Sequence, residues 1–245
     1  MCGRYVSTRS PEDLVQLFRV TDWRTEERLA PSWNVAPTDE VWAVLERTGR
    51  GDEDTAAAAG RQLRPLRWGL VPPWAKDVKV GARMINARVE TVHEKPAFRR
   101  EFLKHRCLLP ADGFYEWQQE KDPATGKPRK QPYFIHPEDG QVMALAGLYA
   151  YWRDRSVQHD DEPGAWLVTC TIITTEATDA AGRVHPRMPL ALTEDHYDAW
   201  LDPHHHDPDH LRALLSRPAD GHLDARPVSP AVNSVRNNGP ELLEG

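Results

Sequence analysis

The sequence predicts an α+β fold: a mostly antiparallel, strongly curved or barrel-like β core that carries peripheral helices. Two observations predict it. Short runs rich in β-branched and aromatic residues, bounded by glycine or proline, recur along most of the chain, as strands do. The runs with helical spacing are scattered among these strands and do not alternate with them, which argues against a parallel sheet built from βαβ units.

The predicted strands are short and apolar on at least one face, and they occupy residues 41–47, 65–71, 84–90, 106–110, 113–118, 132–136, 142–152 and 165–174. Helical spacing and end signals predict helices over residues 11–20, 95–105, 175–184, 193–201 and 208–217. The first of these begins with a proline and acidic residues, and the last two begin with good capping chemistry.

No linker long enough to separate two domains interrupts the chain, so we expect residues 1–245 to form a single domain. Three charged, aperiodic stretches rich in Gly, Pro or Asp predict surface insertions near residues 47–61, 119–131 and 153–164. The tail from about residue 218 has little periodicity, and we expect it to be ordered only by packing on the body.

Composition excludes several classes of protein. No signal-peptide pattern and no apolar run near the ~18 residues of a membrane span is present, so we expect a soluble, cytoplasmic protein with no membrane partner. Three cysteines without a CxxC pair argue against a disulfide framework or a Cys-rich zinc site. The histidines of DPHHHDPDH (202–210) are interpreted as a surface cluster, so we expect no metal.

The charge is unevenly distributed. The whole chain carries −6, but residues 61–106 contain twelve basic and four acidic side chains, a local charge of +8. Such a segment can bind phosphates while the overall charge limits indiscriminate adhesion. A solvated basic face is the competing interpretation, and from charge alone it is somewhat favoured.

The chain opens MCGRY, with Cys2 directly behind the initiator methionine. Aminopeptidases usually remove Met in front of so small a side chain, and the product would carry a 1,2-aminothiol at its N-terminus. A free α-amine has a pKa of about 8 and a thiol one of about 8.5, so a useful fraction of each is nucleophilic at neutral pH. Cys107 and Cys170 lie in apolar runs, where a thiol is usually a small buried hydrophobe.

Two strand motifs carry polar groups suited to catalysis. In NARVE, alternation places Asn86, Arg88 and Glu90 on one face, although an ordinary half-exposed strand would show the same pattern. In GFYEW, Glu116 lies between aromatic residues. A desolvated carboxylate there would have a raised pKa suited to acid–base chemistry, and a buried salt bridge to an arginine is an equally good explanation.

Two loop motifs add a proton carrier and a stacking group. HPRMP places His185, which can transfer protons near pH 7, beside Arg187, which can grip a phosphate. A lone histidine in such a loop is more often structural. GLVPPWAKD holds Trp74 in a proline-stiffened loop where an exposed indole could stack on nucleobases, whereas tryptophan is usually a core residue.

Together these motifs resemble the SOS response-associated peptidase (SRAP) family of abasic-site processing proteins. The similar blocks run in one order from Cys2 to about Leu192: MCGRY, WNVAPT, RWGLVPPW, NARVET followed by EKPAFR, RCLLPADGFYEW and HPRMP. The insertions at 47–61 and 153–164 fall between these blocks.

The resemblance implies a protein that binds single-stranded DNA and forms a covalent crosslink at abasic sites. It implies Cys2 as nucleophile, Asn86 and Glu116 as active-site polar residues, and His185 as the catalytic histidine. It also implies DNA-binding residues, with phosphate contacts from Arg4, Arg88 and Arg187 and a channel shaped by Asn34 and Trp74.

The expected chemistry is capture of the abasic-site aldehyde by the Cys2 amine and thiol, giving a thiazolidine that shields the lesion during the DNA damage response. It needs no metal or organic cofactor. The expected partner is single-stranded DNA with abasic sites, with a preference for single–double strand junctions left open, and the protein is expected to be a monomer. Two alternatives remain: a thiol peptidase, beyond the autoproteolytic loss of Met1 that the resemblance implies, and a non-covalent DNA-binding module.

Overall fold

The computed structural model describes residues 2–47, 60–121, 126–216 and 222–244. Its centre is a closed barrel of five strands in the spatial order β5–β4–β7–β10–β11. Neighbours along this order are antiparallel, and parallel pairing of β11 with β5, at Thr169 with Arg67 and Cys170 with Trp68, closes the ring. The barrel strands are β4 (Glu40–Arg47), β5 (Gly60–Trp68), β7 (Arg106–Ala111), β10 (Met143–Arg153) and β11 (Trp166–Glu176). The predicted curved, mostly antiparallel β core is therefore confirmed.

Short strands extend this sheet where the barrel strands run on. They are β2 (Asp22–Trp23) on β5, β6 (Asn86–Arg88) and β12 (Arg187–Pro189) on β11, and β13 (Ala191–Leu192) on β10. β6 covers only part of the predicted strand 84–90, because turns follow Arg88. The last part of β11 thus lies between two segments that carry predicted site residues.

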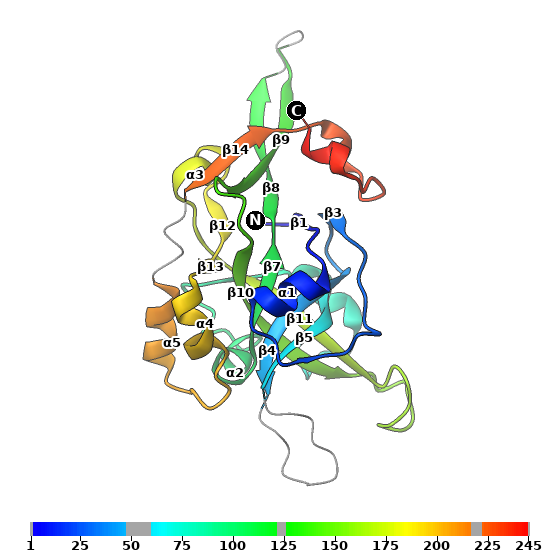
Figure 1. Cartoon of the computed structure of the whole chain (residues 1–245). Coiled ribbons are helices and arrows are strands. Elements are labelled where there is room, and N and C mark those ends of the chain that lie inside the picture. The colour runs from blue at the N-terminus through cyan, green and yellow to red at the C-terminus, as the bar shows by residue number, and fades with distance from the viewer. Residues whose placement is uncertain (1, 48–59, 122–125, 217–221, 245) are drawn as a thin grey trace.

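A second sheet rises from one end of the barrel in the order β14–β9–β8–β1–β3 (Figure 1). Its strands are β1 (Tyr5–Ser7), β3 (Ser32–Val35), β8 (Gly113–Lys121), β9 (Pro128–Pro137) and β14 (Leu223–Pro227). Most of the described residues of the predicted insertion at 119–131 form strands, because β8 and β9 pair from Phe114 with Ile135 as far as Lys121 with Pro128. The hydrophobic pattern does not predict this hairpin, because its paired side chains are mostly polar.

The helices lie on the outside (Figure 1): α1 (Pro11–Leu17), α2 (Arg99–Lys104), α3 (Asp179–Val184), α4 (Glu194–Leu201), α5 (Pro208–Leu215) and the 3₁₀ turns η1 (Val78–Arg83), η2 (Pro230–Asn233) and η3 (Pro240–Leu243). Each predicted helix is present but shorter. Ser10 caps α1 through a bond from the Asp13 amide, and Asp207 caps α5. Segment 48–59 of the predicted insertion at 47–61 lies outside the described residues, and residues 154–165 join β10 to β11 without helix or strand.

Two apolar cores share the barrel wall. One lies between the barrel and the helices and includes Phe102 and Trp200. The other fills the barrel end that faces the second sheet, and it contains Tyr5, Trp68 and all three cysteines, each fully buried. Cys2 is therefore embedded at the junction of barrel and second sheet. Within the described residues, no helix is both long and apolar enough to cross a bilayer.

Candidate active site

The start of the chain is held beside the strand that carries Glu116. Tyr5 pairs with Phe114 in antiparallel register, and the Tyr115 amide donates to the Arg4 carbonyl at 3.0 Å. This ladder brings the residues before Arg4 alongside the part of β8 that follows Tyr115. Cys2 is 0% exposed, and its Sγ lies 3.8 Å from the Arg4 carbonyl oxygen.

Asn86 reaches the same place from β6. Parallel pairing of Asn86 with Ile172 and of Arg88 with Thr174 fixes the register of β6 on β11. The Asn86 Nδ2 then donates to the Cys2 carbonyl oxygen at 2.8 Å. Its Oδ1 is buried and accepts no hydrogen bond from the described part of the chain, so this oxygen is available to a donor on a bound molecule.

His185 completes a group of four around Cys2. It follows directly on α3, and its Nδ1 lies 3.0 Å from both the backbone nitrogen and the carbonyl oxygen of Arg187. The same Nδ1 lies 4.0 Å from the Glu116 Oε1. The structure therefore brings together Cys2, Asn86, Glu116 and His185, which the sequence placed on four separate segments.

Burial sets the protonation of this group. Glu116 is 3% exposed, and desolvation raises the pKa of its carboxyl, with the charge of nearby His185 opposing the shift. Desolvation also raises the pKa of the Cys2 thiol, and the Glu116 carboxylate raises it further. The thiol is thus protonated at neutral pH, while the carboxyl is suited to both donating and accepting a proton.

Arg187 and Arg88 flank the site differently. Arg187 binds Glu90 through two bonds, Nη1 to Oε1 at 2.6 Å and Nη2 to Oε2 at 3.1 Å, and Nη2 also donates to the Thr174 carbonyl at 2.7 Å. The hydrogen bonds from Arg187 lower the pKa of Glu90. Arg88, two residues after Asn86, is exposed. The two cations therefore stand at the rim of the group, with Arg187 already engaged by a carboxylate.

The side chains of Arg4 and Asn34 are joined by a hydrogen bond. Asn34 is 4% exposed, and its Oδ1 accepts from the Arg4 Nη1 at 2.7 Å. Both side chains also donate to backbone carbonyls between Val232 and Asn237. A direct contact of the buried Asn34 amide with DNA does not fit this arrangement.

Trp74 is 60% exposed at the tip of the loop after β5. The loop is anchored beneath it, since Ala75 is buried and its carbonyl accepts from the Trp152 Nε1 at 2.8 Å. The interpretation of Trp74 as a core residue is therefore wrong, and its indole is presented to solvent on a fixed support.

Sequence reasoning missed the contribution of the C-terminal residues. Their carbonyls hold Arg4 and Asn34, and the Asn238 side chain binds the Trp33 amide. The signal that could have revealed them is the pair of asparagines before Gly239 in a tail otherwise lacking periodicity, because such residues favour tight backbone structure.

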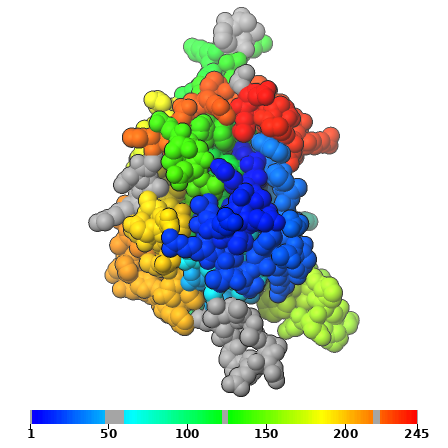
Figure 2. All heavy atoms as spheres, in the orientation of Figure 1, coloured from blue at the N-terminus to red at the C-terminus, as the bar shows by residue number. Residues whose placement is uncertain are grey.

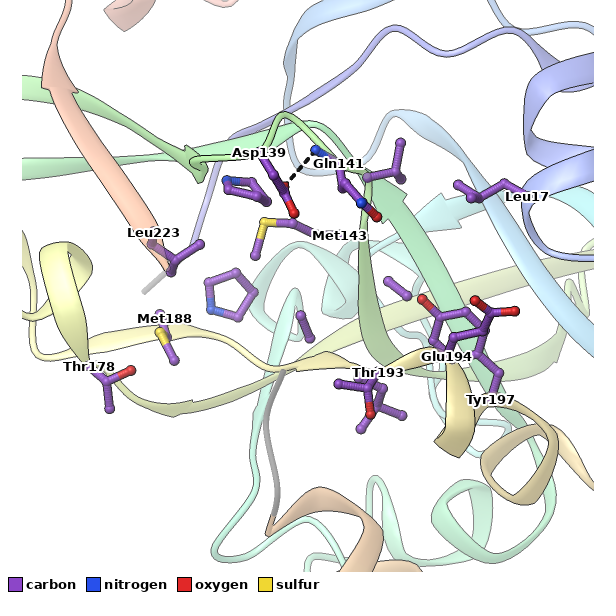
Figure 3. Close-up of a pocket in the computed structure, with 16 residues that line it drawn as sticks. Leu17, Asp139, Gln141, Met143, Thr178, Met188, Thr193, Glu194, Tyr197 and Leu223 are labelled. Carbon is purple, nitrogen blue, oxygen red and sulfur yellow. Dashed lines mark hydrogen bonds between the residues drawn. The ribbon is translucent and has the colours of Figure 1, made fainter. Parts of the chain in front are cut away.

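A cavity of about 410 Å³ opens elsewhere, between β12, the start of β10 and α4 (Figure 3). Met143, Met188 and Leu223 line it, with polar groups from Thr193 and Glu194 at its edge. Because neighbouring residues of a strand point to opposite faces, Met188 faces this cavity while Arg187 faces the other way. None of the four central residues lines it. In the described part of the chain, no group of three or more His, Cys, Asp and Glu side chains is arranged to hold a metal.

Several known proteins are similar to this chain in sequence or in fold. The model of the SOS response associated peptidase (SRAP) family matches residues 1–235. The abasic site processing protein YoqW of Bacillus subtilis is 39% identical over 244 residues, which is 100% of this chain and 99% of that protein. The abasic site processing protein HMCES of Gallus gallus is 34% identical and is matched over 91% of this chain and 68% of its own length. A crystal structure of a Bacteroides thetaiotaomicron protein, 24% identical, covers 99% of each chain with a TM-score of 0.76 and shares the fold.

Proposed function

The chain belongs to the SOS response associated peptidase (SRAP) family, and on that basis we propose that it captures abasic sites in single-stranded DNA as a covalent crosslink through Cys2. The relatives named as abasic site processing proteins support the substrate. The observation that carries the proposal is the position of Cys2, whose carbonyl is held by Asn86 beside Glu116 and His185.

The first step requires removal of Met1, to which we assign the peptidase activity implied by the family name. The Cys2 α-amine then attacks the aldehyde carbon of the ring-opened sugar. A C–N bond forms, the carbonyl oxygen leaves as water, and an imine results. Because burial keeps the thiol protonated, the amine is the better first nucleophile.

The second step closes the ring. The Cys2 sulfur adds to the imine carbon, its proton passes to the imine nitrogen, and a five-membered thiazolidine forms with no further loss. Ring closure is favoured because the sulfur is attached to the reacting residue. Over both steps the amine, the thiol and the aldehyde combine with the loss of one water molecule.

Glu116 and His185 move the protons. A carboxyl with a raised pKa can protonate the departing hydroxyl and then accept a proton, which a fully ionised carboxylate cannot do. His185 lies on the Glu116 side of the site and assists sugar ring opening or reversal of the crosslink. The buried Oδ1 of Asn86 accepts a hydrogen bond from the Cys2 amine or the sugar.

We assign DNA binding to two exposed side chains, those of Arg88 and Trp74. Arg88 provides charge for a phosphate, and Trp74 offers an indole face for stacking on an unpaired base. Covalent capture removes the aldehyde that would otherwise drive strand breakage by β-elimination, so the protein shields the lesion while the strand lacks a template.

An oligonucleotide crosslinking assay tests this proposal. Purified protein mixed with an abasic single strand should give a slowly migrating adduct that survives denaturation. Cys2→Ala keeps an α-amine but lacks sulfur, so its adduct should persist only after borohydride reduction of the imine. A chain with an N-terminal extension keeps the thiol but lacks the amine and should give none. A stable adduct in both variants would exclude Cys2 as the nucleophile, and peptide turnover without DNA would favour a peptidase.

A further inference from the structure

The C-terminal segment packs on the second sheet, which includes β1 (Figures 1 and 2). Val232 and Leu242 are 0% and 1% exposed, and they join Val6 of β1 and Tyr115 of β8 in one apolar cluster. Residues 230–238, here termed the clasp, therefore cover the side of β1 that points away from the barrel, while Tyr5 points into the barrel core.

Asn34 holds the clasp from β3. Its Nδ2 lies 3.3 Å from the Val232 carbonyl oxygen, 3.0 Å from that of Ser234 and 2.9 Å from that of Asn237. Three carbonyls converging on one buried amide fix the curvature of this segment. Removing the amide would take a donor from three wholly or partly buried hydrogen bonds and would leave Arg4 to hold the Val232 carbonyl.

Arg4 holds the clasp from the N-terminal segment. Its Nη1 donates to the Asn34 Oδ1 at 2.7 Å and to the Val232 carbonyl at 2.9 Å, and its Nη2 donates to the Asn233 carbonyl at 3.3 Å. All three acceptors are neutral, and burial lowers the pKa of this guanidinium. The contacts use the planar fork of arginine for geometry, which a lysine could not reproduce.

The clasp also fixes the strand that carries Glu116. The Asn233 Oδ1 accepts from the Trp117 Nε1 at 2.7 Å, and the Asn238 Oδ1 accepts from the Trp33 amide at 2.7 Å. Nine residues thus bridge the segment that begins with Cys2, strand β3 and the residue next to Glu116.

We infer that the clasp sets the position of Cys2 relative to Glu116, with Arg4 and Asn34 acting as positioning residues for crosslinking. The inference rests on the proposed function, since it concerns the same nucleophile. It assigns Arg4 a role in geometry in place of the phosphate contact implied by family resemblance. No clasp residue needs to touch the DNA for this role.

Substitutions that release the clasp test the inference. Asn34→Asp keeps the acceptor for Arg4 but replaces the donating amide with a carboxylate facing three carbonyls, Asn34→Ala removes both functions, and Arg4→Lys keeps the charge without the fork. The matched control is Val235→Ala, because Val235 lies in the clasp and is 59% exposed. Each protein is measured for its single-turnover crosslinking rate at saturating abasic DNA, its affinity for intact single strands and the salt dependence of that affinity.

The three variants should crosslink roughly ten- to hundredfold more slowly, because a small misplacement of a reacting group costs that much in rate. Their affinity for intact single strands and its salt dependence should be unchanged. Val235→Ala should behave like the wild type in all three measurements. A wild-type rate in folded Asn34 variants would overturn the inference, and so would an Arg4→Lys defect confined to affinity and its salt dependence. Should the Asn34 variants not fold, Trp117→Phe, which removes only the bond to Asn233, takes their place under the same criteria. A wild-type protein that forms no adduct would instead refute the proposed function.

Discussion

Asn86 and Cys2 are joined by a hydrogen bond of 2.8 Å from the Asn86 Nδ2 to the Cys2 carbonyl oxygen. The bond connects a strand added to the barrel with the first described residue of the chain. Its geometry depends on the register of β6 on β11, where Asn86 lies beside Ile172. The barrel thus holds the proposed nucleophile, Cys2, through the Asn86 side chain. The backbone that runs from Cys2 into β1 connects it to the second sheet.

Asn86→Ala should slow crosslinking without weakening DNA binding, because it removes the bond that orients Cys2 and leaves the exposed Arg88 in place. The Cys2 carbonyl loses a donor worth about 1 kcal/mol, so we expect a loss of about fivefold in the single-turnover rate. Asn86→Asp should be no better, since its carboxylate would face the carbonyl. Loss of affinity for intact strands with an unchanged rate would assign Asn86 to binding alone.

Glu116→Gln should reduce the crosslinking rate by roughly 10²- to 10⁴-fold, the usual contribution of a positioned proton donor and acceptor. Glutamine keeps the size of the side chain but cannot carry the proton. The wild-type rate should depend on pH through the raised pKa of this carboxyl, and that dependence should disappear in the variant. Rates measured from pH 4 to 9 in both proteins decide this, and an identical pH profile would argue against the role.

Glu116 should also make folding stability depend on pH. Its pKa in the folded protein is raised by burial, so the folded state holds this proton more tightly than the unfolded chain. The stability from this group is fully present below the ordinary carboxyl pKa of about 4.3 and is lost as pH rises through the raised value. Urea denaturation at pH 4 and pH 8 should therefore show that the free energy of unfolding of Glu116→Gln, relative to that of the wild type, is higher at pH 8 than at pH 4. A gain in the opposite direction would mean that the carboxyl pKa is lowered.

Arg88→Glu should weaken binding to intact single-stranded DNA and reduce its salt dependence, because one phosphate contact is lost and a repulsive charge replaces it. The matched control is Arg212→Glu on α5, which makes the same charge change at an exposed residue that forms an ion pair with Asp209. Equal effects of the two substitutions would indicate that net charge alone, not a contact at Arg88, governs binding.

Much of the fold follows from local pattern. The barrel strands predicted at 41–47, 106–110, 142–152 and 165–174 are present with ends shifted by at most two residues, because each is a continuous buried run. The polar hairpin of β8 and β9 and the strand β14 lack that pattern, since they are held by backbone pairing along partly exposed strands. The closure of β11 on β5 is a long-range parallel contact that no local signal reports.

The candidate site likewise has features that local sequence predicts and features that only the folded chain shows. Alternation in NARVE predicted that Asn86 and Arg88 share a face, and the aromatic neighbours of Glu116 predicted its burial and raised pKa. The contacts of Arg4 and Asn34 with Val232 join residues about two hundred positions apart, so only the folded chain reveals them. Family resemblance supplied residue identities but not this geometry.

The central claim is that the nitrogen and sulfur of Cys2 both bond to the sugar carbon of an abasic site. Peptide mapping by mass spectrometry of the protein crosslinked to an abasic oligonucleotide, after nuclease and protease digestion, tests it most directly. The account predicts an N-terminal peptide that begins with Cys2, lacks Met1, carries the sugar remnant with loss of one water, and has no free thiol. A remnant attached to any lysine or other side chain, or to a peptide that retains Met1, would contradict it.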